Sequence, residues 1–330
     1  MTKLIYIISP GHSGSTLADC ILGTHPDFIS SGELRYLGWQ IERTKDVKPT
    51  VEAQNACTCA KDFRECEYWS EVFERLRSKT GIDMRNDPLL FNMYYFRQFS
   101  YQDRGSLKPA LPGKIKARLT RKWIQAGHSY KKLIWMEPKL GLWIKNNWLL
   151  YETMAEVASK PIVVDSSKHL TIALLLQQYR PNDVTILFLN RSPEGLAASH
   201  RKWAVKSGKN FHLQDFIEMH KKHHSRLTQC KNSIDNLKYI DIQYEEMVKH
   251  PATFLHTCVA QTGANEVFKR QTDEEFYIDP SKLHLVAGNP MRYRGRQLIK
   301  NDERWKTELT DKEKEYIATK YYKTMDKRWL

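Results

Sequence analysis

The sequence predicts an α/β protein with a central parallel β-sheet flanked by helices. Four short apolar runs rich in β-branched residues are predicted strands, at residues 4–9, 161–164, 184–189 and 237–242. Helix-like stretches follow the first three, at residues 15–23, 170–179 and 193–206. Continuous apolar strands that alternate with helices are typical of a parallel sheet covered on both faces. With 41% hydrophobic residues, the 330-residue chain can also bury a sizeable core.

Residues 34–160 do not fit this alternation. The stretch is rich in Trp and Tyr and contains predicted helices around residues 114–132 and 140–159. Long excursions from the carboxyl ends of parallel strands usually build the substrate side of a site. Because no repeat or Pro/Gly-rich linker interrupts the chain, we predict one domain, residues 1–330, with a large helical insertion.

The net charge of +14 predicts an affinity for anions, because a field of this size concentrates anionic ligands. A basic nucleic-acid-binding module is one alternative. The chain shows no helix-turn-helix, zinc-finger or RNA-binding aromatic signature, so no nucleic-acid partner is predicted.

The chain is predicted to be cytoplasmic. No apolar run approaches the ~18 residues that span a bilayer, so we predict neither a transmembrane helix nor a membrane partner. Residues 4–8 are too short for a signal peptide, and no small-residue cleavage site follows them. Six cysteines in 330 residues form no disulfide scaffold.

Three of the cysteines cluster in the sequence: Cys57, Cys59 and Cys66. Thiolates at short spacing could bind a structural Zn²⁺, but no fourth ligand is obvious. A disulfide is a second alternative. We favour plain reduced thiols and assign no metal ligands.

The first predicted strand is followed by a loop that is suited to binding phosphate. Its small and hydroxylated residues let backbone N–H groups and the helix N-terminus point at an anion. A nucleotide-triphosphate P-loop would also need a Lys before the Ser/Thr, which is missing here. An ordinary turn that caps a helix is the alternative. The loop residues are Gly11, His12, Ser13, Gly14, Ser15 and Thr16.

A second anion site is predicted where the third predicted strand ends. Arg191 lies at this end, Pro193 suits the first turn of the following helix, and Ser199 lies about two turns further on. Both side chains could bind one anion. Alternatively, Arg191 pairs with a carboxylate and Ser199 is a packed helix residue.

Together these motifs resemble the sulfotransferases that use 3′-phosphoadenosine-5′-phosphosulfate (PAPS). The resemblance covers most of the chain outside the insertion. It rests on an ordered set: residues 11–17, His25-Pro26, Gly32-Glu33, Arg191 with Ser199 eight residues on, and residues 244–247.

The resemblance implies a P-loop-like sulfotransferase fold with PAPS as sulfuryl donor and no metal. The loop of residues 13–17 would bind the 5′-phosphosulfate, Arg191 and Ser199 the 3′-phosphate, and Tyr244 would lie near the adenine. A late Gly- and Arg-containing loop would close over the 3′-phosphate, with Arg294 as first choice and Arg292 next.

The resemblance also implies catalytic residues. Glu33 is the candidate general base, because a hydroxyl is a poor nucleophile until its proton leaves; the alternative is a surface Glu. Lys168 would assist departure of the leaving oxygen, and His169 is a rival base; a helix-capping cluster with a solvated Lys is the alternative. His12 stands where the family carries Lys or Arg. It could be protonated beside phosphates, or be a neutral hydrogen-bond donor.

The predicted reaction is sulfuryl transfer to a hydroxyl or amine of a small molecule, with a natural product as the first choice. Tyr36 and Trp39 follow Glu33 closely and are predicted to contact this acceptor. The alternatives are a protein tyrosine or a glycan as acceptor, and a nucleotide-dependent kinase.

Overall fold

The computed structural model describes residues 1–86, 88, 111–136, 138–267 and 271–322. At its centre lies a parallel five-stranded sheet, which confirms the predicted fold class. Its strands in spatial order are β2 (Phe28–Ser30), β3 (Ile162–Asp165), β1 (Lys3–Ile8), β4 (Val184–Asn190) and β5 (Tyr239–Gln243).

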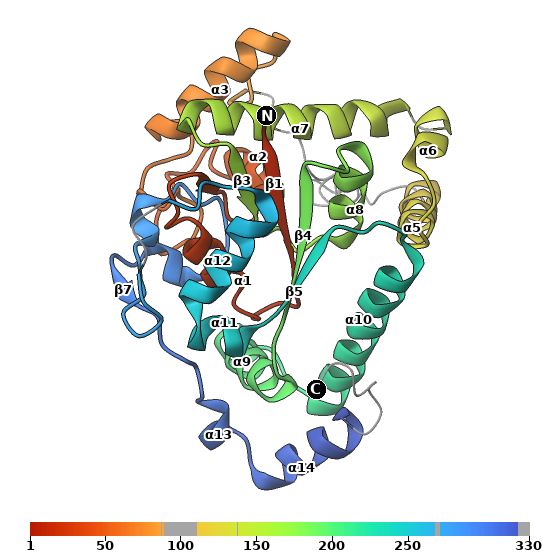
Figure 1. Cartoon of the computed structure of the whole chain (residues 1–330), viewed down its shortest axis with the longest axis vertical. Coiled ribbons are helices and arrows are strands. Elements are labelled where there is room, and N and C mark those ends of the chain that lie inside the picture. The colour runs from red at the N-terminus through yellow and green to blue at the C-terminus, as the bar shows by residue number, and fades with distance from the viewer. Residues whose placement is uncertain (87, 89–110, 137, 268–270, 323–330) are drawn as a thin grey trace.

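Helices cover both faces of the sheet (Figure 1). Neighbouring side chains of a strand point to opposite faces. The even-numbered residues of β1 therefore pack in one core with α7 (Pro138–Ala158) and α8 (Leu170–Tyr179). The odd-numbered residues pack in a second core with α1 (Ser15–Leu22) and α12 (Pro251–Thr262).

The structure adds β2, which the sequence did not predict. At three residues this strand is too short to show a pattern, and its partner is residues 162–164 of β3. The insertion therefore joins two neighbouring strands, β2 and β3. Residues 87 and 89–110 of the predicted insertion lie outside the described residues.

The insertion is helical where it is described. Its predicted helix at residues 114–132 is two helices, separated by a turn at Gly127. Gly127 has φ +82°, and a Cβ there would lie 2.7 Å from the carbonyl oxygen of Ser233, so a larger residue is excluded. The two helices are α5 (Leu111–Gln125) and α6 (Tyr130–Met136). Before them come the 3₁₀-helix η1 (Leu34–Tyr36), α2 (Leu37–Arg43) and α3 (Glu67–Thr80).

The chain after β4 adds helices and a small two-stranded antiparallel sheet. A third apolar cluster joins α9, α10 and α14. No helix in the described part of the chain combines the length and apolarity needed to cross a membrane. The elements are α9 (Pro193–Lys206), α10 (Leu213–Ser233), α11 (Tyr244–Lys249), β6 (Tyr277–Ile278), η3 (Pro280–Lys282), η4 (Pro290–Tyr293), β7 (Gln297–Leu298), α13 (Trp305–Glu308) and α14 (Asp311–Lys320).

Candidate functional site

The predicted site residues gather at the carboxyl edge of the sheet. The strands β3, β1 and β4 are neighbours and run in the same direction, so the loops that follow them meet there. These loops carry Lys168, residues 9–14 and Arg191, respectively.

The loop after β1 presents backbone donors at the start of α1. Gly14 is the N-cap residue with φ +87°, and no side chain caps the helix. The Ser13 hydroxyl turns back to donate to the carbonyl of Pro10 at 2.8 Å. In the described chain, no group accepts from the backbone N–H of Ser13 or Gly14. This is the arrangement that binds an anion at a helix N-terminus.

Arg191 links the two predicted anion sites. Its Nη1 donates to the carbonyl oxygen of His12 at 2.9 Å and to the Ser199 hydroxyl at 3.2 Å. Its Nη2 lies 3.2 Å from an Asp302 carboxylate oxygen, and the guanidinium lies 4.2 Å from the centre of the Tyr244 ring. The loop after β1 and the start of α9 therefore lie side by side, joined by hydrogen bonds from one guanidinium. Both the predicted serine and the alternative carboxylate partner are present.

The pocket beside Arg191 contains charges that the sequence did not single out. Lys202, Asp302 and Arg304 line it together with Arg191 and Ser199. Lys202 follows Ser199 by three residues on α9, a spacing that could have indicated a shared face. Asp302 and Arg304 come from a distant segment and gave no sequence signal. Arg304 and then Arg191 hold the pKa of the Asp302 carboxyl well below its usual range.

Tyr244 packs directly on the loop after β1. A Cβ built at Gly14 would lie 2.5 Å from the Tyr244 ring. The late loop also reaches this place, because the Asn289 N–H donates to the Thr16 hydroxyl at 3.0 Å. Two segments from the carboxyl-terminal part of the chain thus contact the predicted phosphate-binding loop near its start.

The two predicted arginines of the late loop lie in different environments. The Arg292 side chain is buried and its Nη2 donates to the carbonyl of Gln54 at 2.8 Å and to the Tyr293 hydroxyl at 2.5 Å. Arg292 is therefore used in packing against the insertion. Arg294 is exposed, and its role at the 3′-phosphate stays a prediction.

Glu33 and Lys168 form an ion pair, with Nζ 2.5 Å from Oε1 and both side chains less than one-fifth exposed. Glu33 precedes η1, and Lys168 follows β3 with φ +61°. The Lys168 N–H donates to the carbonyl of Ile7 in β1 at 3.1 Å, which positions the lysine beside the loop after that strand. The predicted base and the predicted leaving-group lysine are thus brought together.

His12 is neutral in this structure at pH 7. Burial, followed by His200, Lys168 and Arg191, lowers its pKa to about 4. The His200 ring lies 4.7 Å away, edge to face, and its Nε2 is 3.1 Å from the carbonyl oxygen of Gly11. The surrounding protein groups alone therefore favour the neutral form of His12. His200 itself was not predicted.

His169 has a structural contact at the start of α8. Its Nδ1 accepts from the backbone N–H of Ile172 at 3.4 Å, so the side chain caps the helix. This supports the capping alternative for His169. Glu33, which pairs with Lys168, remains the stronger candidate base.

Tyr36 and Trp39 lie just beyond Glu33. Both are half-buried, their ring centroids are 6.2 Å apart, and the Tyr36 hydroxyl accepts from Arg35 at 2.5 Å. The Arg43 guanidinium lies over the Trp39 ring at 5.0 Å. They form a partly accessible aromatic pair that follows the candidate base in the chain.

Asp19 contacts two segments of the candidate site and was not predicted as a site residue. It is fully buried in α1, and its Oδ2 accepts from the N–H of Gly32 at 2.9 Å and the Ser166 hydroxyl at 2.8 Å. These partners lie just before Glu33 and Lys168, so one carboxyl positions both. The sequence signal that could have indicated this role is an Asp among the apolar residues of α1. Burial raises its pKa to about 7.

Replacing Asp19 with Asn is expected to remove a pH dependence of stability. The folded protein holds the Asp19 proton up to about pH 7, whereas the unfolded chain releases it near pH 4. Wild-type stability therefore falls as pH rises between these values. Relative to wild type, Asp19→Asn should gain on the order of 4 kcal/mol from pH 4 to pH 8. Urea unfolding across this range measures the difference; parallel curves would contradict the assignment.

Comparison with known proteins identifies the family. The model described as "Sulfotransferase family" matches residues 5–265. The chain belongs to the sulfotransferase family. No curated protein matches it in sequence.

Several solved structures are similar to the chain at low identity. The sulfotransferase domain from the curacin biosynthetic pathway is 14% identical, with 98% of each chain covered and a TM-score of 0.47. The sulfotransferase domain from the Synechococcus PCC 7002 olefin synthase is 13% identical, with 98% of this chain and 95% of that chain covered and a TM-score of 0.42. Sulfotransferase STF1 from Mycobacterium tuberculosis H37Rv is 12% identical, with 81% and 69% covered and a TM-score of 0.42.

Proposed function

We propose that the protein is a PAPS-dependent sulfotransferase that modifies a hydroxyl or amine of a small molecule. The observation that carries the proposal is the position of Arg191, whose guanidinium contacts both His12 of the first loop and Ser199 of α9. A nucleotide with one phosphate at each end of its ribose needs two anion sites that open into one cleft. Family membership supports the reaction type.

The residues present fit such a nucleotide. Arg191 is buried, and its Nε has no partner in the described chain, which leaves a donor for a further acceptor. A Cβ at Gly195 would lie 2.8 Å from this Nε, so the glycine keeps the guanidinium approachable. Arg191, Ser199 and Lys202 would bind the 3′-phosphate, and Arg294 would approach from the late loop. The loop Gly11–Thr16 would bind the 5′-phosphosulfate, and the aromatic ring of Tyr244 would lie near the adenine.

The catalytic step follows from the Glu33–Lys168 pair. When bound, PAPS supplies a sulfuryl group that the acceptor attacks in line, with the 5′-phosphate as leaving group. Glu33 takes the acceptor proton, which makes the oxygen or nitrogen nucleophilic. The Lys168 ammonium and the His12 imidazole stabilise charge at the leaving oxygen. The backbone N–H groups of Ser13 and Gly14 hold the phosphate in place, so positioning supplies much of the rate.

The proposed acceptor is a small molecule, with a natural product as first choice. The half-buried rings of Tyr36 and Trp39, which follow Glu33 in the chain, offer aromatic contacts for such an acceptor beside the Arg35 and Arg43 guanidinium groups. A kinase reading would predict ATP turnover with Mg²⁺, which the missing P-loop lysine argues against.

Calorimetric titration with 3′-phosphoadenosine-5′-phosphate (PAP), the desulfated product, tests this proposal. PAP should bind at micromolar strength or better, and AMP, which lacks the 3′-phosphate, more weakly. Arg191→Ala should weaken PAP binding at least tenfold, or about 1.4 kcal/mol, because it removes the buried cation. AMP affinity should fall less than PAP affinity, because AMP lacks the 3′-phosphate and Arg191 contacts its proposed site only through His12 and Tyr244.

Two further variants make the titration decisive. Ser199→Ala removes a single hydroxyl from the same site and should cause a smaller loss for PAP. Arg75→Ala removes a half-exposed arginine on α3 and should change nothing. Equal affinity of the wild type for PAP and AMP would overturn the proposed 3′-phosphate site.

A further inference from the structure

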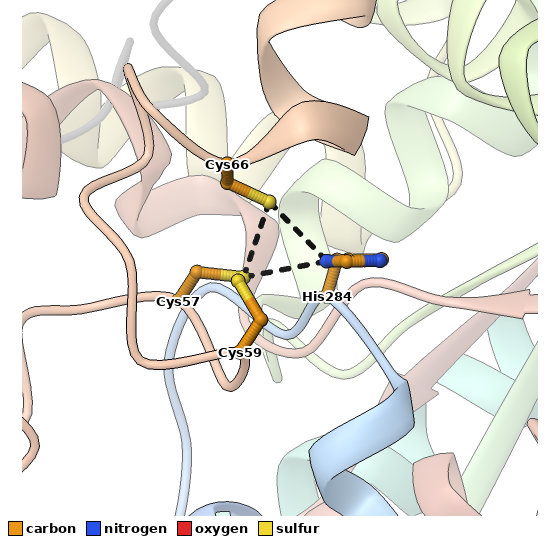
Figure 2. A group of neighbouring side chains, drawn as sticks. All are labelled: Cys57, Cys59, Cys66 and His284. Atoms are coloured by element: carbon orange, nitrogen blue, oxygen red, sulfur yellow. Dashed lines mark hydrogen bonds between the residues drawn. The ribbon is translucent and has the colours of Figure 1, made fainter.

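Three cysteines of the insertion meet a histidine from the other end of the chain (Figure 2). The four are Cys57, Cys59, Cys66 and His284, and their sulfur and nitrogen atoms all lie within 4.8 Å of one another. Cys57 and Cys66 are fully buried, while Cys59 and His284 are partly buried. The sequence offered no fourth ligand, because His284 follows Cys66 by more than 200 residues.

The three distances among Cys57, Cys66 and His284 are close to the edges of a metal tetrahedron. Sγ of Cys57 and Sγ of Cys66 are 3.7 Å apart. The His284 Nδ1 lies 3.6 Å from the first sulfur and 3.2 Å from the second. Around Zn²⁺ in tetrahedral coordination, with Zn–S near 2.3 Å and Zn–N near 2.05 Å, sulfurs lie about 3.8 Å apart and sulfur and nitrogen about 3.5 Å apart. A disulfide would need sulfurs about 2.05 Å apart.

Neighbouring groups hold the ligands in this arrangement. The Trp69 indole N–H donates to the His284 carbonyl at 3.0 Å, and the Tyr68 ring stacks on the imidazole with centroids 5.0 Å apart. The Ala60 N–H donates to the Cys57 carbonyl at 2.9 Å, which folds the loop into a tight turn between two ligands. Orientation of ligands by outer contacts is a general feature of metal sites.

We propose that Cys57, Cys59, Cys66 and His284 bind a structural Zn²⁺. Three thiolates and one imidazole are a donor set that Zn²⁺ prefers, and Cys₃His is a common structural combination. Four protein ligands complete the tetrahedron and leave no position for a substrate. The ion is therefore structural, and the sulfuryl-transfer chemistry does not use it.

The proposed ion links the insertion to residues 284–287, which contact the backbone beside the candidate base Glu33. Directly after His284, the Leu285 N–H donates to the Thr58 hydroxyl at 3.2 Å. One residue further, the Val286 N–H donates to the Ser31 carbonyl at 2.9 Å, beside Gly32 and Glu33. A Cβ at Gly32 would lie 2.6 Å from the Ala287 carbonyl oxygen. Binding of the metal thus fixes the position of residues 284–287, which pack against the backbone at Glu33.

Metal analysis of the full-length protein, purified with reductant and without added metal, tests the inference. Inductively coupled plasma mass spectrometry should find about one zinc per chain. Cys66→Ser should retain less than a tenth of this amount. Cys258→Ser, which alters a fully buried cysteine of α12 outside the group, should keep the full amount. Loss of zinc from both variants alike would overturn the proposal.

Cobalt substitution of the wild type keeps the test valid if Cys66→Ser does not fold. Co²⁺ exchanged into the site should give the intense visible d–d bands and thiolate charge-transfer bands of a tetrahedral sulfur-rich site. Wild-type protein with reduced thiols that contains no zinc and binds neither Zn²⁺ nor Co²⁺ would overturn the proposal. These readouts do not depend on nucleotide binding. They therefore test the metal site separately from the proposed sulfotransferase activity.

Discussion

Replacing Glu33 with Gln is expected to lower kcat by at least about 100-fold, while PAP affinity stays within about twofold. The amide keeps the shape of the side chain but cannot accept a proton from the acceptor. Glu33 is bonded to Lys168, outside the Arg191 pocket, so nucleotide binding should survive. PAP release from PAPS with a panel of phenols, alcohols and amines measures turnover, and calorimetry with PAP measures binding.

Glu52→Gln is a matched control for this experiment, because Glu52 is an exposed carboxylate of the insertion. It should be fully active. If Glu33→Gln were equally active, Glu33 would not be the base, and His169→Ala would become the next variant to measure. A parallel loss of PAP affinity in Glu33→Gln would instead indicate that the side chain organises the nucleotide site.

Gly14→Ala is expected to destabilise the protein by about 2–4 kcal/mol and to weaken PAP binding at least tenfold. Gly14 has φ +87°, which costs an L-residue about 1–2 kcal/mol. In addition, the new Cβ would lie 2.5 Å from the Tyr244 ring, which must move away from the loop. Urea unfolding measures the free energy of unfolding, and calorimetry with PAP measures the loss of binding.

Gly81→Ala separates the two causes. Gly81 has a similar φ of +73° at the end of α3, but a Cβ there would meet nothing within 4 Å. This control should lose only about 1–2 kcal/mol and bind PAP normally. Equal destabilisation by both variants would show that the Tyr244 ring moves away from the new Cβ without a loss in the free energy of unfolding.

The sequence determined the parallel α/β fold because periodicity is a local property. Apolar runs predicted β1, β3, β4 and β5, and the helices α8 and α9 have the predicted bounds. Loop residues at the ends of strands could also be predicted to converge, because parallel strands end at the same edge. For this reason Lys168 and Arg191 could be placed at this edge from the sequence, whereas their roles rest on the resemblance to the family and stay predictions.

Only the tertiary structure decided which side chains meet. Asp302 beside Arg191, the hydrogen bond from Ser166 to Asp19, and His284 beside the cysteines each join segments far apart along the chain. The short strand β2 likewise exists through its pairing with β3. Such contacts form between residues that are distant in the sequence and close only in the folded chain. The local spacing of residues therefore does not predict them. The sequence by itself thus determined the order of strands and helices and the loops between them, while the tertiary structure decided which side chains of these loops are in contact.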